Sequence, residues 1–146
     1  MLAAKLDRAG ALLRAAGQVL TYHNHAGEFT QIDGQPVLQL LYDWTQPLNL
    51  QGEIDTYWVK VGGDDPTAWC RKLKNRLPLL HLKDHQEGPD GPNFAEIGYG
   101  TLDWDSIIPA AEASGCEWFI VEQDQTPGDP FDSLKKSFDF IAAELC

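Results

Sequence analysis

The segment that decides the fold is LPLLHL at residues 77–82, which the polar residues KDH follow at 83–85. A short apolar run that ends in polar residues is typical of a strand in a parallel sheet. Similar runs predict three further strands, within residues 18–22, 49–57 and 118–121. Helical spacing and capping residues predict five helices, over residues 2–16, 36–44, 65–76, 102–114 and from 129 or 132 to 145.

Helices and strands therefore alternate along the whole chain. This order is typical of βαβ units, in which helices cover both faces of a parallel sheet. Asp65 followed by Pro66 is a typical helix start, and Asp103 is a second candidate cap. Residues 84–93 are polar and contain several Gly and Pro residues, so we predict a loop there. We expect one α/β domain over residues 1–146.

The composition limits the partners. The chain has 22 acidic and 11 basic residues, a formal net charge of −11. Nucleic-acid binding depends on clustered Lys and Arg, so we expect no nucleic-acid partner, whereas an acidic surplus suits a protein that holds a divalent cation. We expect no membrane span, because no apolar run reaches the roughly 18 residues that a span needs. We also expect no signal peptide, because charges are scattered through residues 1–17, which lack an unbroken apolar run and a cleavage site.

The three cysteines lie far apart, and none belongs to a CxxC pair. This spacing argues against a disulfide scaffold or a zinc knuckle. It indicates free thiols at Cys70, Cys116 and Cys146 in a reducing compartment, and hence a cytoplasmic location.

Metal-binding side chains follow every predicted strand. Asp55 ends the second strand and Glu122 the fourth, and the chain's four histidines follow the first and third: His23, His25, His81 and His85. Ligands of parallel α/β proteins bind at the carboxyl ends of the strands. Imidazole nitrogens and carboxylate oxygens at one such edge suit a divalent ion such as Mn²⁺, Mg²⁺, Co²⁺ or Zn²⁺.

Each of these residues has a structural alternative. Asp55 alone is equally typical of a helix cap or a turn, and His81 alone of a buried, hydrogen-bonded histidine. Glu122 follows an apolar strand, where an unpaired carboxylate is costly, so a structural role is harder to assign. We expect His85 to be solvated. We expect Trp69 and Trp118 to belong to the core, and Trp58 either to the core or to a binding site.

Five motifs together resemble those of the sugar phosphate isomerase/epimerase superfamily, the xylose isomerase-like (β/α)8 barrels that also include the endonuclease IV-type (AP endonuclease family 2-like) proteins. They are YHNHAGEF at 22–29, IDTYWV at 54–59, HLKD at 81–84, EIGYG at 96–100 and IVEQD at 120–124. The match runs from about residue 18 to 141 and corresponds to the last four βα units of a TIM barrel, its C-terminal half.

The resemblance implies a set of site residues. Four of them would hold the metal: Glu28, Asp55, His81 and Glu122. His23 is the alternative to Glu28 as the ligand that follows the first predicted strand. Glu122, Glu28 and Lys83 would be catalytic. The residues that contact substrate would be His23, His25, Trp58 and Lys83.

The implied activity is metal-dependent isomerisation or epimerisation of a small sugar, sugar phosphate or polyol, by removal of a proton next to a carbonyl. The alternatives are a keto-sugar lyase or dehydratase of the same fold, or a non-catalytic carbohydrate-binding or partner subunit. Four strands make only half of an eight-stranded barrel and leave two sheet edges open. We therefore expect a truncated chain, a homo-oligomer, or a partner that supplies the other half.

Overall fold

A computed structural model describes residues 1–145, and its centre is a four-stranded parallel sheet. The strands are β1 (Thr21–His23), β4 (Gln51–Asp55), β5 (Leu79–Leu82) and β8 (Trp118–Val121), and they lie in the order β1-β4-β5-β8. Each strand pairs in parallel with its neighbour. All four carboxyl ends therefore lie at the same edge of the sheet. This confirms the four predicted strands, although β1 begins three residues later than we expected.

The main helices are α1 (Leu2–Ala15), α2 (Val37–Asp43), α4 (Pro66–Lys72), α5 (Trp104–Glu112) and α6 (Pro130–Phe140). Both predicted caps are confirmed, because Asp65 accepts from Thr67 N at 2.9 Å and Asp103 from Ser106 N at 3.2 Å. The last helix begins after Asp129 rather than Asp132. A π-helical turn follows at Ile141–Leu145.

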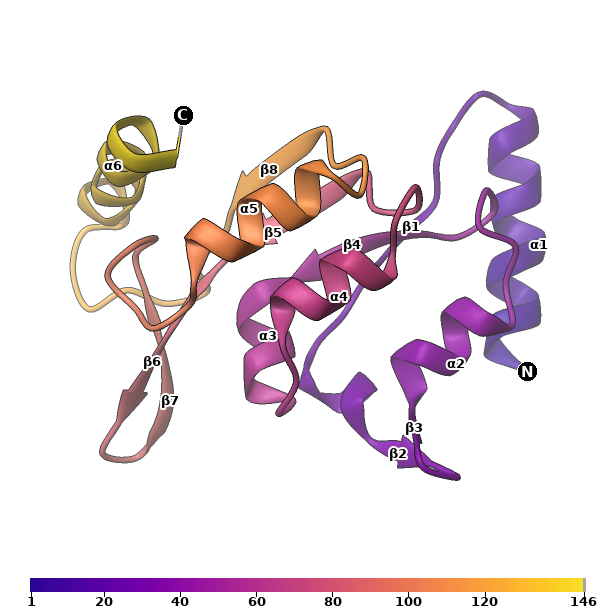
Figure 1. The fold of residues 1–146 in the computed structure, drawn as a ribbon, viewed down its shortest axis with the longest axis horizontal. Helices are drawn as coiled ribbons and strands as arrows, with labels where there is room; N and C mark the ends of the chain where they lie inside the picture. The colour runs from indigo at the N-terminus through magenta and orange to yellow at the C-terminus, as the bar shows by residue number, and fades with distance from the viewer. Residues whose placement is uncertain (146) are drawn as a thin grey trace.

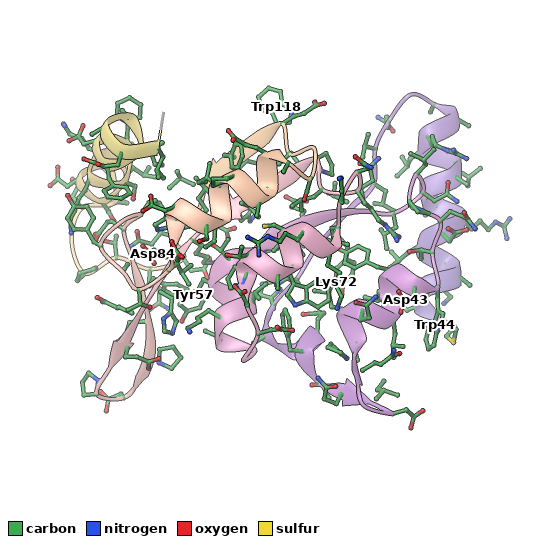
Figure 2. The ribbon with its side chains drawn as sticks, viewed as in Figure 1. Asp43, Trp44, Tyr57, Lys72, Asp84 and Trp118 are labelled. Atoms are coloured by element: carbon green, nitrogen blue, oxygen red, sulfur yellow. The ribbon has the colours of Figure 1, made fainter. Side chains whose placement is uncertain are left out.

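The helices cover one face of the sheet only. Figure 1 shows α4 and α5 side by side over the sheet, with α1 toward the β1 end and α6 toward the β8 end. Ile54, Leu80 and Leu82 point to the covered face and are buried in the main apolar core. On the opposite face Trp118 is 64% exposed, and Figure 2 places it at the margin of the molecule. The expectations of two covered faces and of a core position for Trp118 were therefore wrong, whereas Trp69 does belong to the core.

Two segments differ from the predicted secondary structure. Residues 56–57, expected in a strand, begin the short helix α3 (Thr56–Val61), because the Asp55 side chain accepts a hydrogen bond from Trp58 N at 3.0 Å and caps the helix. Residues 84–95, expected to be mainly a loop, form the antiparallel hairpin of β6 (Asp84–Gly88) and β7 (Gly91–Ala95). A smaller hairpin joins β2 (Gln31–Ile32) to β3 (Gln35–Pro36) before α2.

Asp84 anchors the β6–β7 hairpin to the loop before α5. Its carboxylate is fully buried, and Figure 2 labels its position. It accepts hydrogen bonds from one indole and four backbone donors: Trp104 Nε1, His85 N, Gly98 N, Gly100 N and Leu102 N. Glycine is required at position 100, because a Cβ there would collide with this carboxylate. The sequence predicted a loop at residues 84–93 because local composition contains no information on hydrogen bonds between residues 14–20 positions apart.

His85 is also held by this hairpin and is only 3% exposed, so the expectation of a solvated side chain was wrong. Its Nδ1 lies 3.0 Å from Thr101 Oγ1, and its ring lies against that of Tyr57. Cys70 and Cys116 are free thiols, as expected, and burial raises the pKa of Cys70 to about 12. Cys146 lies outside the described residues. Within residues 1–145, no helix combines the length and apolar character that crossing a membrane requires.

We predict that Asp84→Asn destabilises the protein by about 2–4 kcal/mol, because an amide nitrogen replaces an oxygen that accepts buried N–H donors. The measurement is urea unfolding followed by tryptophan fluorescence. Asp90→Asn, at an exposed position of the same hairpin, serves as the control and should change stability by less than about 0.5 kcal/mol. Equal effects of the two substitutions would contradict the anchoring role of Asp84.

Candidate metal centre

Four side chains converge where the strands of the main sheet end. His23, Asp55, His81 and Glu122 each offer one ligand atom, and these atoms all lie within 4.8 Å of one another. They come from β1, β4, β5 and the residue after β8, which are consecutive strands in the sheet. Parallel pairing thus brings together residues that are almost one hundred positions apart in the sequence.

The contacts within this group fit a cation. His23 Nε2 lies 3.2 Å from Asp55 Oδ2, and His81 Nδ1 lies against Glu122 Oε2. His81 Nδ1 and Glu122 Oε2 are buried, yet neither makes a hydrogen bond within the described residues. Buried polar atoms are normally satisfied, so a ring nitrogen and a carboxylate oxygen that face each other without a hydrogen bond mark a place for a positive charge. Two imidazoles and two carboxylates form a donor set that suits Mn²⁺, Co²⁺ or Zn²⁺.

Local electrostatics favour the charged form of His23. Its pKa is raised above the usual value, chiefly by the hydrogen bond to Asp55, which outweighs the opposing effect of burial. The negative charges of Asp55, Glu122 and Glu53 act in the same direction. Proton and metal ion therefore compete for this imidazole.

Lys83 is a buried cation beside the group, with only 1% of its side chain exposed. Its Nζ lies 2.8 Å from Asp124 Oδ2, 3.3 Å from Glu122 Oε1 and 3.5 Å from Asp55 Oδ2. Burial by itself lowers the pKa of Lys83, but the hydrogen bond to Asp124 and the three carboxylate charges raise it overall. The lysine therefore stays protonated and screens the carboxylates from one another.

Aromatic rings enclose the same ammonium group. The centroids of the rings nearest to Lys83 Nζ lie 5.2–5.9 Å away, and they belong to Phe94, Trp58 and Tyr57. Phe94 is supplied by the β6–β7 hairpin, and its ring lies 4.4 Å from that of Tyr57, which Figure 2 places between α3 and this hairpin. Such rings stabilise a cation and exclude water from one side of it.

The structure brings most of the predicted site residues together. The ring of His25 lies 4.8 Å from that of His23 and 5.3 Å from that of Trp58, so both border the cluster. Glu28 is held elsewhere: it accepts from Tyr22 Oη at 3.0 Å and from His25 N at 2.8 Å, and it caps a 3-10 turn at Ala26–Phe29. His23, the alternative to Glu28 in the sequence analysis, is therefore the fourth member of the group.

Three supporting residues were not recognised from the sequence. Glu53 contacts His81, Thr21 contacts Glu53, and the buried Asn24 accepts from Asp55 N at 3.1 Å. Two of them carry a signal, because Thr21 and Glu53 precede His23 and Asp55 by two positions and so share their face of the sheet. For Asn24 no such signal exists, since its contact depends on the chain's path after β1.

With this geometry, comparison with known proteins identifies the family. The model of the family described as "Xylose isomerase-like TIM barrel" matches residues 1–144, and the chain belongs to this family. This confirms the resemblance and the barrel-type fold predicted from the motifs.

Particular relatives are similar to the chain over almost its whole length. An inosose dehydratase of Lacticaseibacillus casei is 27% identical over 99% of this chain and 54% of that protein, and one of Geobacillus thermodenitrificans is 28% identical over 97% and 52%. The crystal structure of a sugar phosphate isomerase/epimerase from Parabacteroides distasonis superposes with a TM-score of 0.84, at 25% identity over 97% and 53%. The chain spans about half the length of the relatives it matches.

We predict that His23 stabilises the metal-free protein more at acidic than at alkaline pH. Because folding raises the pKa of His23, the folded state binds the proton more tightly, and this stabilisation is complete below about pH 6.5 and is lost as the pH rises through the folded pKa. Urea unfolding in EDTA should therefore show a larger difference between wild type and His23→Asn at pH 5.5 than at pH 8.5. A difference that grows with pH would contradict the His23–Asp55 interaction.

Proposed function

We propose that this chain contributes the catalytic residues of a metal-dependent enzyme, at the edge of the sheet where the four strands end. The enzyme removes a proton next to the carbonyl of a neutral keto-sugar or keto-polyol. The convergence of His23, Asp55, His81 and Glu122 within 4.8 Å carries this proposal. A divalent ion held there would polarise the carbonyl and hydroxyl oxygens of the substrate and so acidify the adjacent C–H bond.

The residues of the chain have distinct parts in this reaction. Glu122 is the base, because its carboxylate lies at the group and contacts both His81 and Lys83. Lys83 is a protonated donor 3.3 Å from that base and delivers a proton to substrate oxygen. Trp58 and His25 border the same space and contact the substrate. Glu28 is too firmly engaged in its turn to serve as a second base.

Two outcomes of this proton removal are compatible with the site. Return of the proton to the same carbon on its other face, or to the neighbouring carbon, gives epimerisation or isomerisation. Loss of a hydroxyl group from the next carbon, protonated by Lys83 as it leaves, gives dehydration. The relatives named inosose dehydratase favour the second outcome, and so does a cationic donor placed beside the base.

The charges around the site favour an uncharged substrate. Lys83 is the cation at the cluster, and three carboxylates already engage it. Glu53 adds a further negative charge behind His81. A phosphate group would meet repulsion rather than a basic pocket here. Phe94, whose ring faces Lys83, also lines a cleft of about 350 Å³. The lining of this cleft is uncharged, which suits hydroxyl groups: Gln86, Asn93, Phe94, Gln125, Thr126 and Pro127.

The experiment that tests this function is product analysis with inososes and a panel of ketohexoses, with Mn²⁺, Co²⁺ or Mg²⁺ added. We expect metal-dependent loss of water or isomerisation in wild type, and at least a 1,000-fold loss of kcat in Glu122→Gln with the fold intact by circular dichroism. Glu117→Gln, exposed at the opposite end of β8, is the matched control and should retain activity. An active Glu122→Gln enzyme would overturn the assignment of the base.

We also propose that a second copy of the chain completes the barrel. β1 and β8 are the outer strands of the sheet, and a twofold axis would pair β8 of each copy with β1 of the other into eight parallel strands. The exposed Trp118 and Ile120 would then lie inside the barrel. The expected mass in solution is twice 16.2 kDa by light scattering, falling toward the single-chain mass in Trp118→Glu. A monomeric wild type would contradict this pairing.

A further inference from the structure

A carboxylate outside the four-residue group lies behind His81. Glu53 is on β4, and its Oε1 lies 2.9 Å from His81 Nε2 on the neighbouring strand β5. Its other oxygen, Oε2, accepts a hydrogen bond of 2.5 Å from Thr21 Oγ1 on β1. Three adjacent strands therefore contribute to one chain of polar contacts that ends on the imidazole of His81.

This contact determines which ring nitrogen of His81 carries the hydrogen. An ionised carboxylate only accepts hydrogen bonds, so Glu53 requires a hydrogen on Nε2. In the neutral ring, Nδ1 then keeps its lone pair, and Nδ1 is the buried atom that faces Glu122 without a hydrogen bond. Both ring nitrogens face a carboxylate, Nε2 that of Glu53 and Nδ1 that of Glu122. A cation held by Nδ1 and Glu122 removes the need for a hydrogen on Nδ1, whereas only a hydrogen on Nε2 satisfies Glu53. The opposite tautomer would block Nδ1 with a hydrogen. The arrangement thus favours the tautomer that can bind a metal ion through Nδ1.

Apart from its charge, which helps to raise the pKa of His23, the polar contacts of Glu53 in the described residues are those with Thr21 and His81. The acidic partners of Lys83 are Asp55, Glu122 and Asp124, so Glu53 does not neutralise the buried lysine. Its side chain is also only 21% exposed, and a partly buried carboxylate is costly unless it makes hydrogen bonds. Its two oxygens make these bonds on opposite sides, to Thr21 and to His81.

We propose that Thr21 and Glu53 are positioning residues that hold His81 in the Nε2–H tautomer and thereby set the affinity of the centre for a divalent ion. Thr21 orients the carboxylate, and the carboxylate orients the imidazole. Outer partners of metal-bound histidines contribute about 10- to 100-fold to metal affinity in other proteins. This inference rests on the metal centre of the proposed function, but not on the substrate or on the reaction.

The first test needs no substitution. Long-range ¹⁵N–¹H NMR spectra of the wild-type protein with Zn²⁺ added, a diamagnetic ion that suits this donor set, report the tautomer of each histidine at a pH where the rings are neutral. We expect His81 to carry its hydrogen on Nε2. A hydrogen on Nδ1, or rapid exchange between the two tautomers, would overturn the proposal.

The second test measures Co²⁺ affinity by titration calorimetry. Glu53→Met keeps the length of the side chain but removes the acceptor, so we expect Co²⁺ to bind about 10- to 100-fold more weakly and the Nε2–H tautomer to lose its dominance. Glu53→Gln keeps a carbonyl acceptor, and Thr21→Val removes only the orienting hydroxyl, so both should give intermediate losses. Glu87→Met is the matched control, because Glu87 faces His85 at 3.6 Å on the exposed side of the hairpin.

The outcomes separate this proposal from the proposed function. Equal Co²⁺ affinity in wild type and in a folded Glu53→Met protein would overturn the positioning role, and so would an equal loss in Glu87→Met. If Glu53→Met does not fold, Thr21→Val and the wild-type tautomer decide the question. Normal Co²⁺ binding without turnover of any keto-sugar would contradict the proposed reaction and leave the positioning role supported. Absence of Co²⁺ binding in wild type would overturn both.

Discussion

The constraint on which the rest of the structure depends is the parallel pairing of four strands. In a parallel sheet every strand ends at the same edge, so the residue that ends one strand lies next to the residue that ends the following strand. In this chain His23 and Asp55 end their strands, His81 is the last residue but one of β5, and Glu122 follows β8 by one position. The four residues lie far apart in the sequence, yet their ligand atoms all lie within 4.8 Å of one another.

The site also depends on the pairing of two buried charges with groups of opposite charge. Asp55 and Lys83 are both nearly inaccessible to solvent, and each would be costly alone. Lys83 is satisfied by three carboxylates and by surrounding rings, and Asp55 by His23, by Lys83 and by the backbone N–H of Trp58. Asp55 therefore serves two purposes at once: it caps α3 and it belongs to the candidate metal centre. The structural and functional alternatives considered for this residue do not exclude each other.

The face of the sheet that no helix covers corresponds to the interior of the family's barrel, and the site lies on this face. The face that carries Asp55 and His81 also carries the exposed Trp118 and Ile120. In a closed (β/α)8 barrel, side chains fill the interior, and the site lies above them at the carboxyl ends of the strands. The same alternation along β8 that directs Glu122 to the site thus directs Trp118 and Ile120 to the place where four further strands would cover them.

Local pattern in the sequence determined much of this arrangement. Apolar runs set the strands, Asp65 and Asp103 set helix starts, and the position of Asp55, His81 and Glu122 after three runs placed them at one edge. Alternation within β4 would also have indicated Glu53. These features could be predicted because they depend on neighbours within a few residues.

Only the tertiary structure shows that His23, and not Glu28, lies in the four-residue group, because a turn engages the glutamate with Tyr22 and His25. It also decided the hairpin at 84–95, which the buried Asp84 secures through donors 14–20 residues away. The exposure of Trp118 likewise depends on which face of the sheet the helices cover. The contacts of Asp84 and the packing of the helices on one face join residues distant in the chain, and no local pattern contains the energy of such contacts. The contacts of Glu28 are local, but which side chain reaches the cluster depends on the path of the chain after β1.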